Sequence, residues 1–327
     1  MLNQPPRFFY YPSREFEFRH EAVHYRDLVK NRLYSRAQAG VRLKWMIEYF
    51  SILEGELRLP PLNFPDFDPP SDPALITDSY IELAATETRK FWKLGDGPIP
   101  NLIDILERNG SIIGQICLDL PNLDGLSFWS NERERPFILL NSDKATYVRS
   151  RFDVAHELGH MLLHRNIVEG IDKKSPIYRR MEDQAYLFAS ALLLPKNSWA
   201  RDIKNPSVAT LATFKTLKPK WKTSVAAQIM RLSKLKLIDD DKKASLYKQY
   251  GSKGWRKKEP FDDLWELEKP KLFVQATKML AEHVFGADII IQMFPLRSEN
   301  LSEITGLPKT FFDRSDLPIQ LNNNYLN

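Results

Sequence analysis

The sequence predicts an α+β fold in which a small antiparallel sheet packs on helices, with helical parts before and after it. Three short apolar runs are typical of strands, and longer segments around them carry apolar residues at helical spacing. The composition is that of a globular protein, because 43% of the 327 residues are hydrophobic and 27% are charged.

Composition excludes several classes of protein. A single cysteine, Cys117, excludes a disulfide scaffold, and 12% aromatic residues exclude low-complexity disorder. The first six residues, MLNQPP, lack the basic and then apolar pattern of a signal peptide. No window approaches the roughly 20 apolar residues of a membrane span. We therefore expect a cytoplasmic protein.

The N-terminal part is expected to form one long helix and then a linker. From about Glu21 to Leu57, apolar residues recur at helical spacing with Arg and Lys between them. Residues 59–70 are rich in proline, which lacks the N–H needed inside a helix or a central strand. We predict three regions: a helical N-terminal region over 1–70, a central domain over 71–196, and a basic, mostly helical domain over 197–327.

The central region is expected to hold the sheet and the helices that cover it. Two of its strands read as a hairpin around the charged turn 131–135. The elements expected in chain order are helices at 74–93 and 99–108, a strand at 112–118, the hairpin strands at 125–129 and 136–141, and helices at 145–165 and 177–194. Further helices are expected at 223–237, 239–250 and 268–284.

Positive charge is concentrated in residues 196–258. This segment holds 17 Lys and Arg against four Asp, a formal charge of +13 in a chain whose net charge is only +5. Such a segment can bind DNA or an acidic partner, although lysines on the solvated faces of helices would give the same pattern. No zinc finger, RNA-recognition motif or basic zipper accompanies it.

The segment His156-Glu157-Leu158-Gly159-His160 has the H-E-x-x-H pattern. On a helix, residues four apart lie on one face, so the imidazoles of His156 and His160 can converge on one metal ion. Glu157 lies about 100° round the helix and can act on the attacking water without binding the metal. This is the zinc-peptidase arrangement.

A second match, His20-Glu21-Ala22-Val23-His24, shows that the pattern alone is not sufficient. A metal helix inside a protein should have apolar neighbours. Val154-Ala155 and Met161-Leu162-Leu163 flank the first match, whereas Arg19 and Tyr25-Arg26-Asp27 flank the second. We therefore interpret His20 and His24 as two histidines on a linker helix.

A catalytic zinc needs a third protein ligand and keeps one position for water. His164 lies eight residues after His156, about 12 Å along a straight helix, and cannot share a metal with both other histidines. The remaining candidates are carboxylates on or before the next helix: Glu169, Asp172, Glu182 and Asp183. We favour Glu182, because it shares a helical face with two small residues, Ala185 and Ala189.

Several neighbouring residues are weaker candidates. Gly159 costs about 1 kcal/mol in a helix relative to Ala, so a neighbouring segment or the substrate is expected to pass close to it. Asp153 is either an acceptor for a ligand N–H or an acid suited to the helix N-terminus. His164 is expected to lie at the helix end or to contact a ligand. The strands Leu126–Trp129, with Phe128 and Trp129, or Phe137–Leu140 are candidates to pair with a substrate backbone.

Around these residues the chain resembles the ImmA/IrrE family of metallopeptidases. The resemblance lies in Arg151–His164 (RFDVAHELGHMLLH) and in Glu182–Pro195 (EDQAYLFASALLLP), which is similar to the family's E-x-x-A-x-x-F-A and L-L-x-P hallmark. Residues 97–102 and 137–141 are also similar, and the likeness is looser at 220–224 and 254–256. Tyr186 stands where the family usually has asparagine.

The resemblance implies a zincin-like catalytic domain that binds zinc, with manganese as the alternative, and gives the role of third ligand to Glu182. Long relatives often begin with an XRE-type helix-turn-helix domain and a linker similar to residues 5–60, where this chain begins. The DNA-binding module is then either a separate protein or missing because the chain is a fragment. The resemblance implies cleavage of such repressors, so a separate XRE-type repressor is the expected protein substrate. The alternatives are a metal-binding regulator that acts through the basic segment 196–258, or a protease toxin with many targets.

Overall fold

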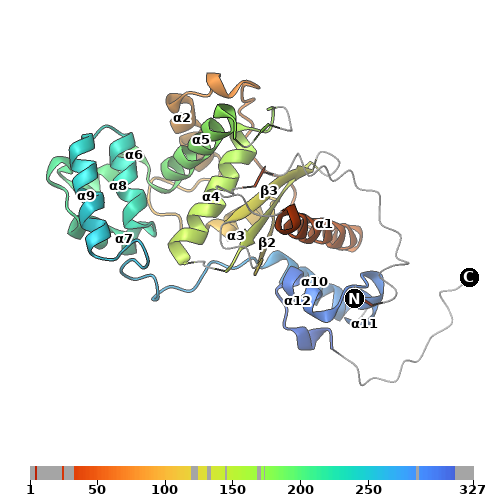
Figure 1. Cartoon of the computed structure of the whole chain (residues 1–327). Coiled ribbons are helices and arrows are strands. Elements are labelled where there is room, and N and C mark those ends of the chain that lie inside the picture. The colour runs from red at the N-terminus through yellow and green to blue at the C-terminus, as the bar shows by residue number, and fades with distance from the viewer. Residues whose placement is uncertain are drawn as a thin grey trace, which may run out of the picture.

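The computed structural model describes residues 4–5, 24–25, 33–118, 124–130, 134–143, 146–167, 171–172, 174–284 and 287–313. It confirms the α+β class (Figure 1). None of the helices in these ranges is long and apolar enough to cross a membrane. The boundaries expected at 70/71 and 196/197 stay predictions.

Four strands form one sheet in the order β1-β3-β4-β2. The predicted hairpin is confirmed, since β3 and β4 pair antiparallel with Leu126 opposite Leu139. The sheet is mixed, however, and the expectation of a purely antiparallel sheet was wrong: β4 lies between β3 and β2 and runs parallel to β2. The strands are β1 (His24–Tyr25), β2 (Ile112–Ile116), β3 (Gly125–Ser130) and β4 (Arg135–Asn141).

Two apolar cores cover the two faces of the sheet, because successive strand residues point to opposite sides. Ile113, Ile138 and Leu140 face the first core, which also holds apolar residues of α2–α9. Leu126 and Phe128 face the second, which is filled by α1, α10 and α12. Figure 1 shows α1 on one side of the strands and α4 on the other.

The central helices agree closely with the sequence prediction. Each has a side-chain cap at its N-terminus, supplied by Thr77, Asn101, Thr146 and Ser175. These helices are α2 (Asp78–Phe91), α3 (Leu102–Arg108), α4 (Tyr147–Leu163) and α5 (Pro176–Leu193), and a short 3-10 turn, Pro73–Leu75, precedes α2.

The long N-terminal helix predicted from residue 21 starts later. Helix α1 (Leu33–Glu56) covers its second half, whereas His24 and Tyr25 are extended and pair with Ser127 and Leu126 of β3. Pairing with an open sheet edge outweighs the helical pattern at these two positions. The interpretation of His20 and His24 as histidines of a linker helix was therefore wrong at His24, and His20 lies outside the described residues.

The C-terminal part consists of two groups of helices. Figure 1 shows α6–α9 beside α5 and α10–α12 at the opposite side of α4. Their bounds are α6 (Lys196–Ile203), α7 (Leu211–Trp221), α8 (Val225–Lys234), α9 (Asp240–Ser252), α10 (Leu272–His283), α11 (Ala287–Met293) and α12 (Ser298–Thr305), with 3-10 turns at Pro206–Val208 and Lys309–Phe311.

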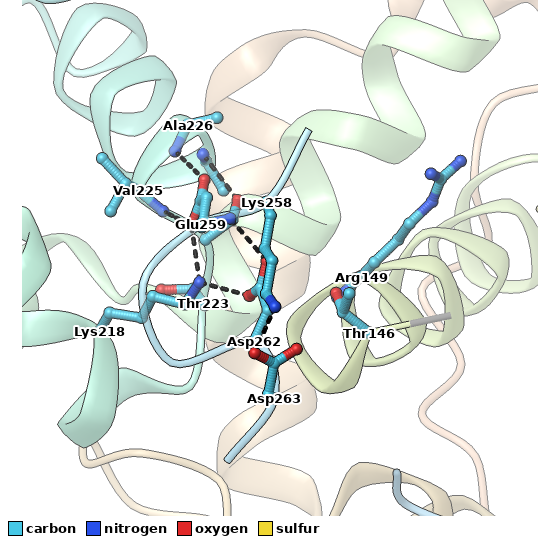
Figure 2. A network of polar contacts seen from close by, with 12 residues as sticks. Thr146, Arg149, Lys218, Thr223, Val225, Ala226, Lys258, Glu259, Asp262 and Asp263 are labelled. Atoms are coloured by element: carbon cyan, nitrogen blue, oxygen red, sulfur yellow. Dashed lines mark hydrogen bonds and ion pairs between the residues drawn. The ribbon is translucent and has the colours of Figure 1, made fainter. Parts of the chain in front are cut away.

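Two cations of the basic segment are buried in ion pairs. Lys218 is fully buried, and its Nζ lies 2.8 Å from a carboxylate oxygen of Glu259 and 2.6 Å from one of Asp262. Figure 2 shows the two contacts as dashed lines. Arg231 is also fully buried and pairs with Glu82 of α2. Glu259 further accepts the backbone N–H groups of Val225 and Ala226, so the N-terminus of α8 is already occupied by a carboxylate.

Buried carboxylates also join the C-terminal segment to α3 and α4. Glu268 accepts the N–H groups of Leu102 and Ile103 at the start of α3 and pairs with the buried Arg151 of α4. In the other direction, Glu107 of α3 accepts the N–H groups of Lys271 and Leu272 at the start of α10. Each helix N-terminus therefore has its backbone N–H groups bound by a carboxyl group from a distant part of the chain.

Glu107 makes the stability of the protein pH-dependent. Burial raises the pKa of Glu107 to about 7 from 4.5, and this effect outweighs the hydrogen bonds from Lys271 and Leu272. The folded protein then keeps a proton that the unfolded chain releases, so the free energy of unfolding falls as the pH rises from about 4.5 to about 7. In Glu107→Gln this part of the pH dependence should disappear, as measured by urea unfolding at several pH values. The exposed Glu266→Gln serves as the control, and an equal slope in Glu107→Gln and wild type would contradict the prediction.

Candidate metal centre

Helix α4 lies in the interior of the protein. Residues 150–163 are all buried, and the helix packs on α3, α5, β3 and β4. Its polar side chains therefore cannot rely on water and must interact with other groups of the protein. The H-E-x-x-H segment occupies the second half of this helix.

Helix α5 lies directly against α4 because both contribute small residues at the contact. A Cβ added to Gly159 would lie 3.1 Å from Ala185 Cα and 3.2 Å from Ala185 O. The neighbouring segment expected near Gly159 is thus α5. Glu182 lies three residues before Ala185, on the same helical face, and therefore points toward α4.

The structure brings His156, His160 and Glu182 together. The two Nε2 atoms lie 3.0 Å apart, and each lies 3.4 Å from one carboxylate oxygen of Glu182. All three ligand atoms fall within 4.8 Å of one another. The imidazoles are almost fully buried, whereas the side chain of Glu182 is 19% exposed.

These distances and donor types fit a zinc ion. Ligand atoms at about 2.0–2.1 Å from a tetrahedral zinc are separated from each other by roughly 3.3 Å. The three distances scatter around this value, and two imidazoles with one carboxylate are ordinary zinc ligands. As long as His156 and His160 are protonated, their hydrogen bonds and charges outweigh the effect of burial, which raises the pKa of Glu182, and hold this pKa well below its usual range. When the imidazoles are neutral, their Nε2 atoms are instead available to a metal.

A chain of hydrogen bonds continues from His160 to the loop before α2. The Nδ1 atoms of His160 and His164 lie 2.9 Å apart, and His164 Nε2 lies 3.1 Å from Gln184 Oε1. The Gln184 amide donates both of its hydrogens, to Pro73 O and Ile76 O, so its oxygen must face His164. His164 Nε2 therefore carries a proton and its Nδ1 accepts one from His160, which leaves His160 Nε2 with a free lone pair for a metal.

Sequence reasoning missed Gln184. Its helical position gave a signal, because it lies three residues after Met181 and four before Phe188, both of which are buried. A glutamine on such a face must find partners inside the protein. His164 was predicted as a residue at the helix end or in contact with a ligand, and it is both the C-terminal cap of α4 and a neighbour of His160.

Glu157 lies on the side of α4 that faces the sheet. It is 1% exposed, and its Oε2 accepts a hydrogen bond of 2.5 Å from the hydroxyl of Ser127 on β3. A Cβ added to Gly125 of the same strand would lie 3.5 Å from Glu157 Oε1. Ser127 was also missed by sequence reasoning, although a serine amid apolar strand residues indicates a buried partner.

The other candidate residues lie elsewhere. Asp153 is buried on α4, and its predicted role stays a prediction. Phe128 belongs to the second core, on the far side of the sheet from α4, and Trp129 packs on Phe64 at 6.3 Å between ring centroids. Asp183 and Asp172 are exposed and outside the cluster of three ligands, and Glu169 lies outside the described residues.

The strands available to a substrate are restricted. Phe137–Leu140 lies in β4, which is paired on both sides, so this candidate was wrong. Leu126–Trp129 lies in β3, whose outer edge is paired with β1 at Leu126 and Ser127. A substrate backbone that adds to this strand must therefore pair beyond these residues or displace β1.

Replacing Gly159 should disturb the metal centre through α5. In Gly159→Ala the added methyl meets the backbone of Ala185 at 3.1–3.2 Å, so α5 must move outward and carry Glu182 with it. We expect a loss of about 1–3 kcal/mol in stability and weaker zinc binding in a chelator competition. Gly55→Ala is the control, because nothing lies within 4 Å of its added methyl. Zinc affinity equal to wild type in Gly159→Ala would refute the prediction.

Comparison with known proteins agrees with this geometry. The family model for the IrrE N-terminal-like domain, Peptidase_M78, matches residues 110–233, from the start of β2 to the end of α8. A search of curated proteins found no match. The matched range contains β3, α4 and α5, and so all residues of the candidate site. Residues 110–233 of the chain are therefore similar to the IrrE N-terminal-like domain of the Peptidase_M78 family, which supports a metallopeptidase.

Proposed function

We propose that the chain is a zinc-dependent endopeptidase in which His156, His160 and Glu182 hold the metal and Glu157 is the general base. The observation that carries the proposal is the convergence of two imidazole nitrogens of α4 and a carboxylate of α5 at 3.0–3.4 Å, with the buried Glu157 next to His156 on α4. A structural zinc usually has four protein ligands. Three ligands leave one position for the reaction, which favours a catalytic site.

The mechanism depends on proton transfer by Glu157. A bound divalent metal would polarise the scissile carbonyl and lower the pKa of water. Glu157 takes a proton from the attacking water as the new C–O bond forms, and gives it to the leaving amine as the C–N bond breaks. Glu182 is the most exposed of the three ligands, so we propose that the substrate approaches from its side.

The hydrogen bonds that connect His160 through His164 to Gln184 contribute to metal binding and not to the proton transfer steps. They fix the tautomer of His160 and the orientation of its ring, which a metal ligand needs. Zinc suits a site of two imidazoles and one carboxylate, and manganese is the alternative.

The proposed substrate is a separate repressor of the XRE helix-turn-helix type, as the family resemblance implies. The exposed cations of residues 196–258 are proposed to bind an acidic part of this partner or the DNA that it covers. Because Glu259 already occupies the N-terminus of α8, contact with phosphate would depend on the exposed lysines rather than on that helix end.

Glu157→Gln tests the proposed chemistry. The variant keeps the shape of the side chain but cannot take a proton, so we expect cleavage of a partner repressor to fall by at least about 100-fold. Zinc content should equal that of wild type, and a chelator should abolish wild-type cleavage. Equal cleavage by both proteins would refute the mechanism. Salt-dependent DNA binding without any zinc-dependent cleavage would instead favour the regulator.

Gln184→Leu tests the support of His160. The leucine cannot accept a hydrogen bond from His164, so the tautomer of His160 is no longer fixed. We expect zinc affinity to fall about 10- to 100-fold, as measured by competition with a chelator of known affinity. Gln249→Leu, on an exposed part of α9, is the matched control. An unchanged zinc affinity in Gln184→Leu would show that the hydrogen bonds from His160 through His164 to Gln184 do not affect metal binding.

A further inference from the structure

Strand β3 has apolar side chains on the face toward the second core, and Gly125 and Ser127 on the face toward α4. Leu126 and Phe128 point into the second core, and the intervening Ser127 therefore points toward α4. Gly125, two residues away, lies on the same side as Ser127. Next to Glu157, strand β3 thus offers one hydroxyl, that of Ser127, and one residue without a side chain, Gly125.

Ser127 binds one particular oxygen of Glu157. Its hydroxyl donates to Oε2, and both side chains are buried, at 0% and 1% exposure. A hydrogen bond to a carboxylate is strong when water is excluded from it. A glutamate side chain has several rotatable bonds, so the backbone of α4 alone does not determine where the carboxylate of Glu157 points. The hydrogen bond from Ser127 fixes the orientation of this carboxylate.

Gly125 leaves space beside the other oxygen. A Cβ there would contact Glu157 Oε1 at 3.5 Å and Leu139 O at 3.4 Å, so a larger side chain would fill the space next to Oε1. The pairing of β3 with β4 fixes both positions, with Gly125 opposite Leu140 and Ser127 opposite Ile138. The two oxygens of Glu157 therefore have different surroundings: Oε2 is held by the sheet, and Oε1 faces a residue that occupies no room.

We propose that Ser127 is a positioning residue for the general base. It holds Oε2 so that Oε1 is the atom that takes the proton from the attacking water and passes it to the leaving amine, and Gly125 places no side chain against Oε1. This inference rests on the proposed peptidase function. It predicts that Ser127 affects the rate of the chemical step, not the binding of metal or substrate.

Ser127→Ala tests the inference in the zinc-loaded full-length protein. We expect kcat to fall about 10- to 100-fold, because the base is no longer held in place, while KM and zinc affinity stay within about twofold of wild type. Ser111→Ala is the matched control: Ser111 is a fully buried serine just before β2, and its hydroxyl has no hydrogen-bond partner among the described residues. This control should retain the kcat of wild type.

A crystal structure of zinc-loaded Ser127→Ala gives a readout that does not require activity. We expect the Glu157 carboxylate to rotate away from its wild-type position or to occupy more than one conformation. Unchanged kcat with an unchanged Glu157 would overturn the role of Ser127 and leave the peptidase proposal intact. Absence of zinc-dependent hydrolysis in wild type would overturn the peptidase proposal, and a Glu157 that keeps its place in the Ser127→Ala crystal would independently overturn the positioning role.

Discussion

The close contact between α4 and α5 at Gly159 and Ala185 is the constraint on which the site depends. Two histidines four residues apart on α4 can converge, but the third ligand comes from another helix. Because Gly159 has no side chain, the backbone of α5 can lie close to the backbone of α4. This close contact lets the carboxylate of Glu182 lie 3.4 Å from both imidazoles. The conformational cost of glycine inside a helix is thus offset by the geometry that it permits.

Burial of α4 has a second consequence, because its polar side chains need partners inside the protein. His160 is connected through His164 to Gln184, Glu157 is held by Ser127, and Arg151 pairs with Glu268. These partners come from the helix itself, from α5, from the sheet and from the C-terminal segment. The elements around α4 therefore contribute to the orientation of the site as well as to its burial.

Carboxylates at helix N-termini hold distant parts of the chain together. Glu268 binds the start of α3, Glu107 binds the start of α10, and Glu259 binds the start of α8. In each case the carboxylate of one segment accepts backbone N–H groups of another segment. Such hydrogen bonds form only when the two segments lie in one particular position, whereas apolar packing allows several positions. The second core, on the far side of the sheet from the site, is closed by α1 and by α10–α12, and Glu107 anchors the start of α10.

The sequence by itself determined the metal helix, the hairpin and the boundaries of most helices, because these follow from local spacing, capping residues and alternation. It also indicated Glu182, since the small residues on one face of α5 are visible in the sequence. Only the tertiary structure decided that β2 runs parallel to β4, that His24 and Tyr25 are extended, and that Ser127 and Gln184 contact Glu157 and His164. The physical reason is that strand pairing and buried hydrogen bonds join residues far apart in the chain, and no local pattern specifies which partner each will meet.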